Sequence, residues 1–295
     1  MAMVKLRIMV DRFQADIWEQ ALASENIPYQ MKGLEMDVFG GTSGLAKGYG
    51  VLYVDERSYE QAKELDKGLM DQLPLNGSAG RLVRMIDHTL LDPAAGMKRL
   101  DEFLEQALGM SCASVCVLPW MVKYADSRLR DSDVGVGTVV DFPLGGETAM
   151  GKKAGALRAM REGATEVDVV LNRGLALHGE LDQAVEEILD TAEAVPDLVV
   201  KVILEIRELG LDLSRRAAEA FINTGVDYLK TGTGFYGSTS VEQVKLLKEA
   251  VGDQMGIKAA GGIRTLDQAL DLAEAGADRL GTSKGHEIWL EVTGS

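Results

Sequence analysis

Apolar positions in residues 81–295 alternate between short β-branched runs and longer stretches with helical spacing. We predict strands at residues 85–89, 114–118, 135–142, 166–172, 199–206, 228–231, 256–260 and 279–282, with helices at 97–108, 148–162, 181–194, 214–223, 240–251 and 266–275. Runs such as 199–204 are apolar almost throughout, as strands of a parallel sheet covered on both faces must be. This succession of β and α units predicts an α/β protein with a closed (β/α)8 barrel, or TIM barrel. A doubly wound open sheet is the alternative that periodicity leaves open.

The first 75 residues follow another pattern, which predicts a small α+β unit ahead of the barrel. Strands are expected at residues 4–10, 29–39 and 50–54, and helices at 12–27 and 58–73. The Gly-rich stretch 40–50 is expected to be a hairpin loop rather than a ligand site, because it lacks the ending of a P-loop. The unit resembles small βαββα modules that some bacterial proteins carry for signalling or regulation. Residues 76–80 are polar and Gly-rich, so we expect them to link module 1–75 to barrel 81–295.

The charge balance narrows the possible partners. The chain has 31 Lys and Arg against 46 Asp and Glu, a net charge of −15, which opposes non-specific nucleic-acid binding. A phosphorylated small substrate stays possible, because backbone N–H groups can form a local anion site. No apolar run approaches the ~20 residues that cross a bilayer, and residues 1–10 have no secretory signal, so we expect a cytoplasmic protein without a membrane partner. Two cysteines and three dispersed histidines predict no metal site, and we expect no cofactor.

Charged side chains interrupt the predicted strands at Lys230, Lys258 and Asp168. Active sites of barrels lie at the C-terminal ends of the strands. A lysine in a dry pocket beside a second cation loses proton affinity, and the free amine can attack a carbonyl to form a Schiff base. Two such lysines, each followed by a Gly-rich turn, favour function over lysines that merely reach solvent or pair with carboxylates. An aspartate beside a reactive amine is suited to moving protons.

Gly-rich turns follow the last two predicted strands, at residues 261–264 and 281–285. Barrels commonly bind phosphate at these two places, on backbone N–H groups. Ser283 and Lys284 would add side-chain donors. Residues 232–237 match the dinucleotide pattern GxGxxG, but they lie late in the domain, so we do not favour a nucleotide site.

The motifs taken together resemble those of the deoxyribose-phosphate aldolase family. They are IDHTLL (86–91), SVCV (114–117), TVVDFPLG (138–145), EVDVVLN (166–172), KVILE (201–205), LKTGTGF (229–235), KAAGGIRT (258–265) and RLGTS (279–283). They occur in the family's order and extend from residue 81 to about residue 290. The resemblance implies a class I aldolase, which works through a lysine Schiff base, and a homo-oligomer, since barrels of this family are commonly dimers or larger.

The resemblance also implies roles for individual residues. Lys230 would form the Schiff base. Lys258 would lower the proton affinity of the Lys230 amine and act with Asp168 in proton transfer. The implied reaction is reversible cleavage of 2-deoxy-D-ribose 5-phosphate to acetaldehyde and D-glyceraldehyde 3-phosphate. Further residues match positions near the pocket, the substrate or its phosphate: Asp87, Thr89, Cys116, Thr233, Gly234, Gly261, Gly262, Gly281 and Ser283, with Lys284 beside them.

Some residues depart from the family's pattern, and they leave the acceptor aldehyde open. Gly232 stands where Ser is usual, Ile206 and Arg207 replace Thr-Gly, Asp141 replaces Gly or Asn, and Lys284 replaces a second Ser. One alternative is another Schiff-base or transaldolase-like lyase, which would keep Lys230 and change the sugar. A second alternative is a ligand sensor with a degenerate barrel, but the intact lysine pair argues against it.

Overall fold

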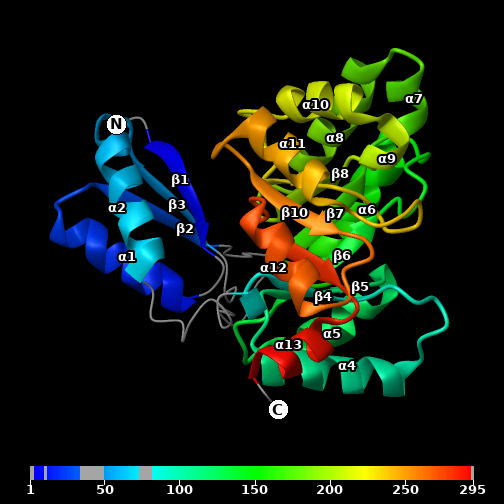
Figure 1. Ribbon diagram of the computed structural model, residues 1–295, viewed down its shortest axis with the longest axis horizontal. Helices are drawn as coiled ribbons and strands as arrows, with labels where there is room; N and C mark the ends of the chain where they lie inside the picture. The colour runs from blue at the N-terminus through cyan, green and yellow to red at the C-terminus, as the bar shows by residue number, and fades with distance from the viewer. Residues whose placement is uncertain (1–2, 10–11, 34–49, 73–81, 294–295) are drawn as a thin grey trace.

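The computed structural model describes residues 3–9, 12–33, 50–72 and 82–293 (Figure 1). Within residues 82–293, parallel strands close into an eight-membered ring in the order β10-β11-β4-β5-β6-β7-β8-β9. They are β4 (Ile86–Leu90), β5 (Ser114–Val117), β6 (Gly135–Val140), β7 (Glu166–Val170), β8 (Val199–Ile203), β9 (Tyr228–Lys230), β10 (Gly256–Ala260) and β11 (Arg279–Thr282). The predicted barrel is confirmed. The open sheet is wrong, because the β11–β4 ladder joins the last strand to the first.

Helices surround the strands on the outside (Figure 1). They are α4 (Met97–Met110), α5 (Val122–Leu129), α6 (Ala149–Arg161), α7 (Arg173–Leu177), α8 (Leu181–Ala194), α9 (Ile206–Leu209), α10 (Leu211–Ala220), α11 (Val241–Val251), α12 (Leu266–Glu274) and α13 (Gly285–Thr293), with a 3-10 turn η2 (Pro119–Met121). The sequence patterns missed α5, α7, α9 and α13. In the described part of the chain, no helix is long and apolar enough to cross a membrane.

The apolar core lies between the strands and the helices. On β7, Val167 and Val169 are fully buried in that outer layer, whereas Glu166 and Asp168 alternate with them and join charged side chains from the other strands. The period-two pattern of a strand therefore separates a hydrophobic outer face from a charged inner face. Burial of each such valine stabilises the fold by about 1.5–3 kcal/mol.

The N-terminal residues form a separate small unit with an antiparallel sheet in the order β1-β3-β2. Its elements are β1 (Met3–Met9), α1 (Arg12–Ser24), β2 (Tyr29–Gly33), β3 (Gly50–Asp55), η1 (Glu56–Ser58) and α2 (Tyr59–Gln72). A core that includes Trp18, Leu22 and Leu52 packs apart from the barrel's core. The predicted α+β unit is confirmed. The loop at 40–49, the strand beyond residue 33 and the linker 76–80 lie outside the described residues.

Candidate active site

Strands β7, β9 and β10 bring two lysines and one aspartate together inside the barrel. Nζ of Lys230 donates to Oδ2 of Asp168 over 2.7 Å, and Nζ of Lys258 donates to the same oxygen over 2.6 Å. Lys230 is 4% exposed, and Lys258 and Asp168 are each 1% exposed. The register explains the meeting, because Lys230 lies opposite Lys258 in the β9–β10 ladder. One carboxylate oxygen thus bridges two buried amines, an arrangement that suits proton transfer between them.

A wider set of buried charges surrounds these three residues. Oδ2 of Asp87 forms an ion pair with Nζ of Lys258 at 2.6 Å, and Oδ1 of Asp87 accepts a hydrogen bond from Arg279 over 2.6 Å. Arg279 also donates to Glu166 over 2.8 Å, and Glu166 forms an ion pair with Lys201. The buried ion cluster consists of Lys201, Lys230, Lys258, Arg279, Asp87, Glu166 and Asp168. It compensates each buried charge with at least one opposite charge, which burial of ions demands.

The cluster fixes the charge of its central members. Burial alone would raise the pKa of Asp168, but the neighbouring lysines outweigh it and hold that pKa below its ordinary value. Burial would likewise raise the pKa of Asp87, and Arg279 and Lys258 lower it instead. For Lys258 the signs reverse: burial would lower its pKa, and Asp168 and Asp87 raise it. At neutral pH, Lys258 is therefore an ammonium group between two carboxylates.

Two smaller side chains border the cluster. Cys116 on β5 is 2% exposed, and burial together with the charge of Asp168 raises the pKa of Cys116 to about 11. Its thiol is protonated at neutral pH and acts as a small apolar neighbour. Thr89 lies opposite Cys116 in the β4–β5 ladder, and its hydroxyl donates to the backbone oxygen of Asp87 over 2.9 Å. The hydroxyl of Thr89 is thus engaged by its own strand.

The loops after β9 and β10 approach each other at glycines. Gly234 and Gly261 have φ of +86° and +106°, and a Cβ on Gly261 would lie 2.9 Å from Cα of Gly234. Side chains at these positions would separate the two loops. The first loop is held by Glu205, the residue just before α9, because the backbone N–H and the hydroxyl of Thr233 donate to its Oε2 over 2.8 and 2.5 Å. The structure therefore gathers the predicted residues Thr233, Gly234 and Gly261 at one edge of the mouth.

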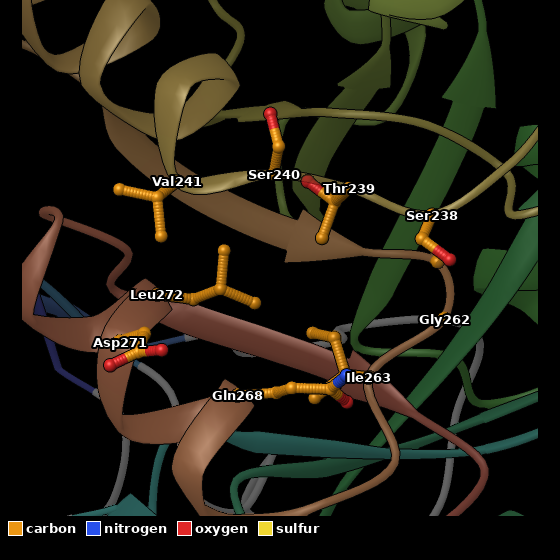
Figure 2. Close-up of a pocket in the computed structure, with 10 residues that line it drawn as sticks. Ser238, Thr239, Ser240, Val241, Gly262, Ile263, Gln268, Asp271 and Leu272 are labelled. Atoms are coloured by element: carbon orange, nitrogen blue, oxygen red, sulfur yellow. The ribbon is translucent and has the colours of Figure 1, made fainter.

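Gly262 borders a groove of about 220 Å³ between these loops and α12. Figure 2 shows the serine and threonine side chains of residues 238–240 on one side of the groove and Gln268 and Asp271 on the other. Gly262 has φ of +73°, and a Cβ there would collide with the side chain of Ser238. The groove reaches the predicted phosphate turn but does not include the lysines.

The predicted residues at the end of β11 have different surroundings. Gly281 lies within the strand, and a Cβ on it would lie 3.1 Å from Cε of Lys258. Ser283 and Lys284 are exposed, and Nζ of Lys284 pairs with Glu287 at the start of α13 over 2.6 Å. The hydroxyl of Thr282 donates to the backbone oxygen of Ile263 over 2.7 Å, so the turns after β10 and β11 are adjacent.

Comparison with known proteins identifies the family to which the barrel belongs. A model of DeoC/LacD family aldolases matches residues 81–291, which is well over half of the chain. The chain belongs to the DeoC/LacD aldolase family. The family resemblance expected from the sequence motifs is thereby confirmed.

Two relatives and two solved structures illustrate the match to the family. The deoxyribose-phosphate aldolase of Thermoanaerobacter sp. (strain X514) is 42% identical over 70% of this chain and 95% of its own length. The deoxyribose-phosphate aldolase of Caldanaerobacter subterraneus subsp. tengcongensis is 44% identical over 70% of this chain and 91% of its own length. The solved aldolase QR15 superposes with a TM-score of 0.69 at 36% identity, covering 72% of this chain and 96% of its own. A tetrameric deoxyribose phosphate aldolase from Aeropyrum pernix superposes with a TM-score of 0.69 at 28% identity, covering 77% of this chain and 96% of its own.

The residues that differ from the family's motifs make specific contacts with their neighbours. At Gly232 a Cβ would lie 2.7 Å from Oε1 of Glu205, so the glycine leaves room for that carboxylate. Nε of Arg207 donates to the backbone oxygen of Ser238 over 2.8 Å, which ties the α9 turn to the loop after β9. Asp141 pairs with the buried ammonium of Lys152 over 2.9 Å. The departures lie around the mouth and leave the ion cluster intact.

Sequence reasoning did not identify Lys201, Glu166 and Arg279 as members of the site. All three are charged residues within strands, the same signal that identified Lys230 and Lys258. Lys201 interrupts the apolar run of β8, and Arg279 begins β11. Lys201 and Glu166 lie on the consecutive strands β7 and β8, whereas Arg279 on β11 meets its partners on β4 and β7 because the ring closes.

Proposed function

We propose that this chain is an aldehyde-lyase that reversibly cleaves 2-deoxy-D-ribose 5-phosphate to acetaldehyde and D-glyceraldehyde 3-phosphate through a Schiff base on Lys230. The observation that carries the proposal is the single oxygen of Asp168 that accepts from both Lys230 and Lys258. Membership of the family and relatives named deoxyribose-phosphate aldolase support this choice of substrate.

The reaction follows from the proton positions. The amine of Lys230 adds to the C1 aldehyde, and loss of water gives a protonated imine. A base removes the proton of the C3 hydroxyl, the C2–C3 bond breaks, and its electron pair forms an enamine while glyceraldehyde 3-phosphate leaves. Protonation of C2 and hydrolysis of the imine then release acetaldehyde and the free lysine. Oδ2 of Asp168 lies 2.6 Å from Nζ of Lys258 and 2.7 Å from Nζ of Lys230, which is close enough for proton transfer at these steps.

The remaining residues are proposed to hold the substrate. The turn at Gly262 and the exposed residues Ser283 and Lys284 would bind the phosphate through N–H, hydroxyl and ammonium donors. Cys116, Asp87 and Thr89 would border the sugar's C1 end, with Thr233, Gly234, Gly261 and Gly281 around them. This scheme uses side chains of the chain alone, so a reaction without metal or cofactor stays our prediction.

Borohydride trapping tests the proposal. Incubation with acetaldehyde and borohydride should add a reduced two-carbon group to the peptide that contains Lys230, as read by peptide mass mapping. Lys230→Ala should lose the label and turnover, whereas Lys245→Ala, at an exposed lysine on α11, should keep both.

Three outcomes would count against the proposal in different ways. A normal label in Lys230→Ala would overturn the assignment of the nucleophile. A label on Lys230 without cleavage of the deoxy sugar would favour another Schiff-base lyase. Neither label nor turnover in the parent chain would favour a degenerate barrel.

We also propose that the chain forms a homo-oligomer. The Aeropyrum pernix relative is described as tetrameric, and this supports self-association without fixing the number of subunits here. Light scattering at micromolar concentration should give a mass that is a multiple of 31.8 kDa. A mass of one chain would contradict the proposal.

A further inference from the structure

Lys152 is a second buried lysine site, outside the ion cluster of the barrel interior. It lies on α6 and is 0% exposed. Its Nζ lies 2.8 Å from the backbone oxygen of Glu147 and 3.2 Å from that of Gly145. It also pairs with Asp141 over 2.9 Å and with Glu187 on α8 over 3.3 Å. Three of these four acceptors belong to residues 141–148, the loop between β6 and α6.

The β6–α6 loop closes around this ammonium group. Asp141 begins the loop in the left-handed region, with φ of +56°. Its backbone oxygen accepts from the N–H of Gly145 over 2.9 Å, and its Oδ2 accepts from the N–H of Glu147 over 2.9 Å. The same Oδ2 faces Nζ of Lys152. The ammonium charge therefore balances Asp141 and orients two loop carbonyls at once, which a neutral side chain cannot do.

The loop carries an aromatic ring to the Schiff-base lysine. Nζ of Lys230 lies 5.7 Å from the centre of the Phe142 ring, and Phe142 meets Phe235 edge to face with centres 5.6 Å apart. At the outer side of the loop, Arg173 donates to the backbone oxygen of Leu144 over 2.8 Å. Phe142 is thus placed by a loop that Lys152 holds from within and Arg173 holds from the mouth.

We propose that Lys152 is a positioning residue, whose ammonium group holds the β6–α6 loop so that Phe142 covers the amine of Lys230. The described contacts of Lys152 are with the loop and with α8, so it acts through Phe142 and not on the reacting atoms. A displacement of about 1 Å at a reacting centre can cost about 10²-fold in rate. The inference rests on the proposed Schiff base at Lys230.

A double-mutant cycle between Lys152 and Phe142 tests this proposal. Lys152→Met should lower kcat about 10- to 100-fold with little change in KM for the phosphorylated sugar, because the phosphate turns follow other strands. In the Phe142→Ala background, the same change should lower kcat less than 3-fold, since the ring that Lys152 positions is gone. Lys153→Met, at the exposed neighbouring lysine, is the matched control and should leave kcat unchanged.

A milder variant covers the case in which Lys152→Met does not fold. Asp141→Asn keeps an acceptor for the N–H of Glu147 and tolerates the positive φ, but removes the charge opposite Lys152. It should lower kcat in the parent and again much less in the Phe142→Ala background. Equal losses in both backgrounds, or an unchanged kcat in a folded Lys152→Met protein, would overturn the proposal. Failure of borohydride trapping in the parent chain would instead overturn the function on which it rests.

Discussion

At the scale of single residues, the oxygen of Asp168 shared by two lysines governs the site. A buried carboxylate is costly unless ion pairs offset its desolvation, and here the Nζ atoms of Lys230 and Lys258 lie within 2.7 Å of one oxygen. The same pairs that stabilise the charge also place a base, the Asp168 carboxylate, between Lys230 and Lys258. Stability and reactivity therefore depend on one group and should change together.

Substitution of Asp168 should show that dependence. Because the pKa of Asp168 is held below its ordinary value, its carboxylate stabilises the fold above pH ~4, and this contribution is lost as pH falls below that point. Asp168→Asn should lower kcat about 10²- to 10⁴-fold. It should also unfold at lower urea than the parent at pH 7, and the gap should narrow toward pH 3. Urea titrations across that range measure the gap, and a gap independent of pH would contradict this account.

The sequence alone identified the residues that stand out as charged positions ahead of Gly-rich turns. Lys230 and Lys258 were found in this way, and Asp168 as a carboxylate that interrupts an apolar strand; the structure brings the three into contact. Arg279 escaped because its partners lie on β4 and β7, far away in sequence, and it meets them only in the closed ring. Lys201 pairs with Glu166 on the preceding strand, and its place within an apolar run was a signal that the sequence reasoning left unused.

At the scale of elements, the strands from β5 to β9 end earlier than their apolar pattern predicts. Residues 199–206 were expected in one strand, yet β8 ends at Ile203 and Leu204 is fully buried beyond it. An apolar residue indicates burial, whereas a strand ends where its hydrogen bonds to the neighbouring strands end. At the C-terminal edge of a barrel, burial continues beyond the end of the strand. Lys230, Lys258 and Asp168 lie within the strands, so the pattern located them well, but it located the turns beyond the strand ends poorly.

The two glycines of the predicted phosphate turns should behave differently when substituted. Gly262→Ala would collide with Ser238 in the groove loop, so it should raise KM for the phosphorylated sugar about 10-fold or more and affect deoxyribose less. Gly281→Ala would press on Lys258, so it should lower kcat for both substrates. Steady-state kinetics on both sugars separates the cases. If Gly262→Ala affected both sugars equally, that turn would not bind the phosphate.

At the scale of the whole molecule, the barrel and the N-terminal unit have separate cores. The barrel's apolar cluster begins at Leu82, and the smaller cluster around Trp18 shares no member with it. The ion cluster likewise draws on the barrel strands. This separation supports the domain boundaries expected from the sequence, which stay a prediction.

Removal of the first 78 residues should therefore leave a folded and active barrel. The shortened chain is expected to keep kcat within about 2-fold of the parent and to unfold in one cooperative transition. Circular dichroism and the aldol cleavage assay on both proteins measure this. An insoluble or inactive product would mean that the N-terminal unit contributes to the barrel's stability or assembly.

The buried ion cluster also bears on how such a protein diversifies over evolutionary time. Its side chains come from β4, β7, β8, β9, β10 and β11, and each one neutralises others. Among the described pairs, Lys230 has Asp168 as its counter-charge, so loss of Asp168 would leave a buried lysine without its ion-pair partner, at a cost of about 3–5 kcal/mol, a large fraction of the stability of many domains. Selection would remove most such intermediates. Gly232 and Arg207 lie at the mouth outside this cluster, so substrate range can drift through single substitutions while the chemistry stays fixed.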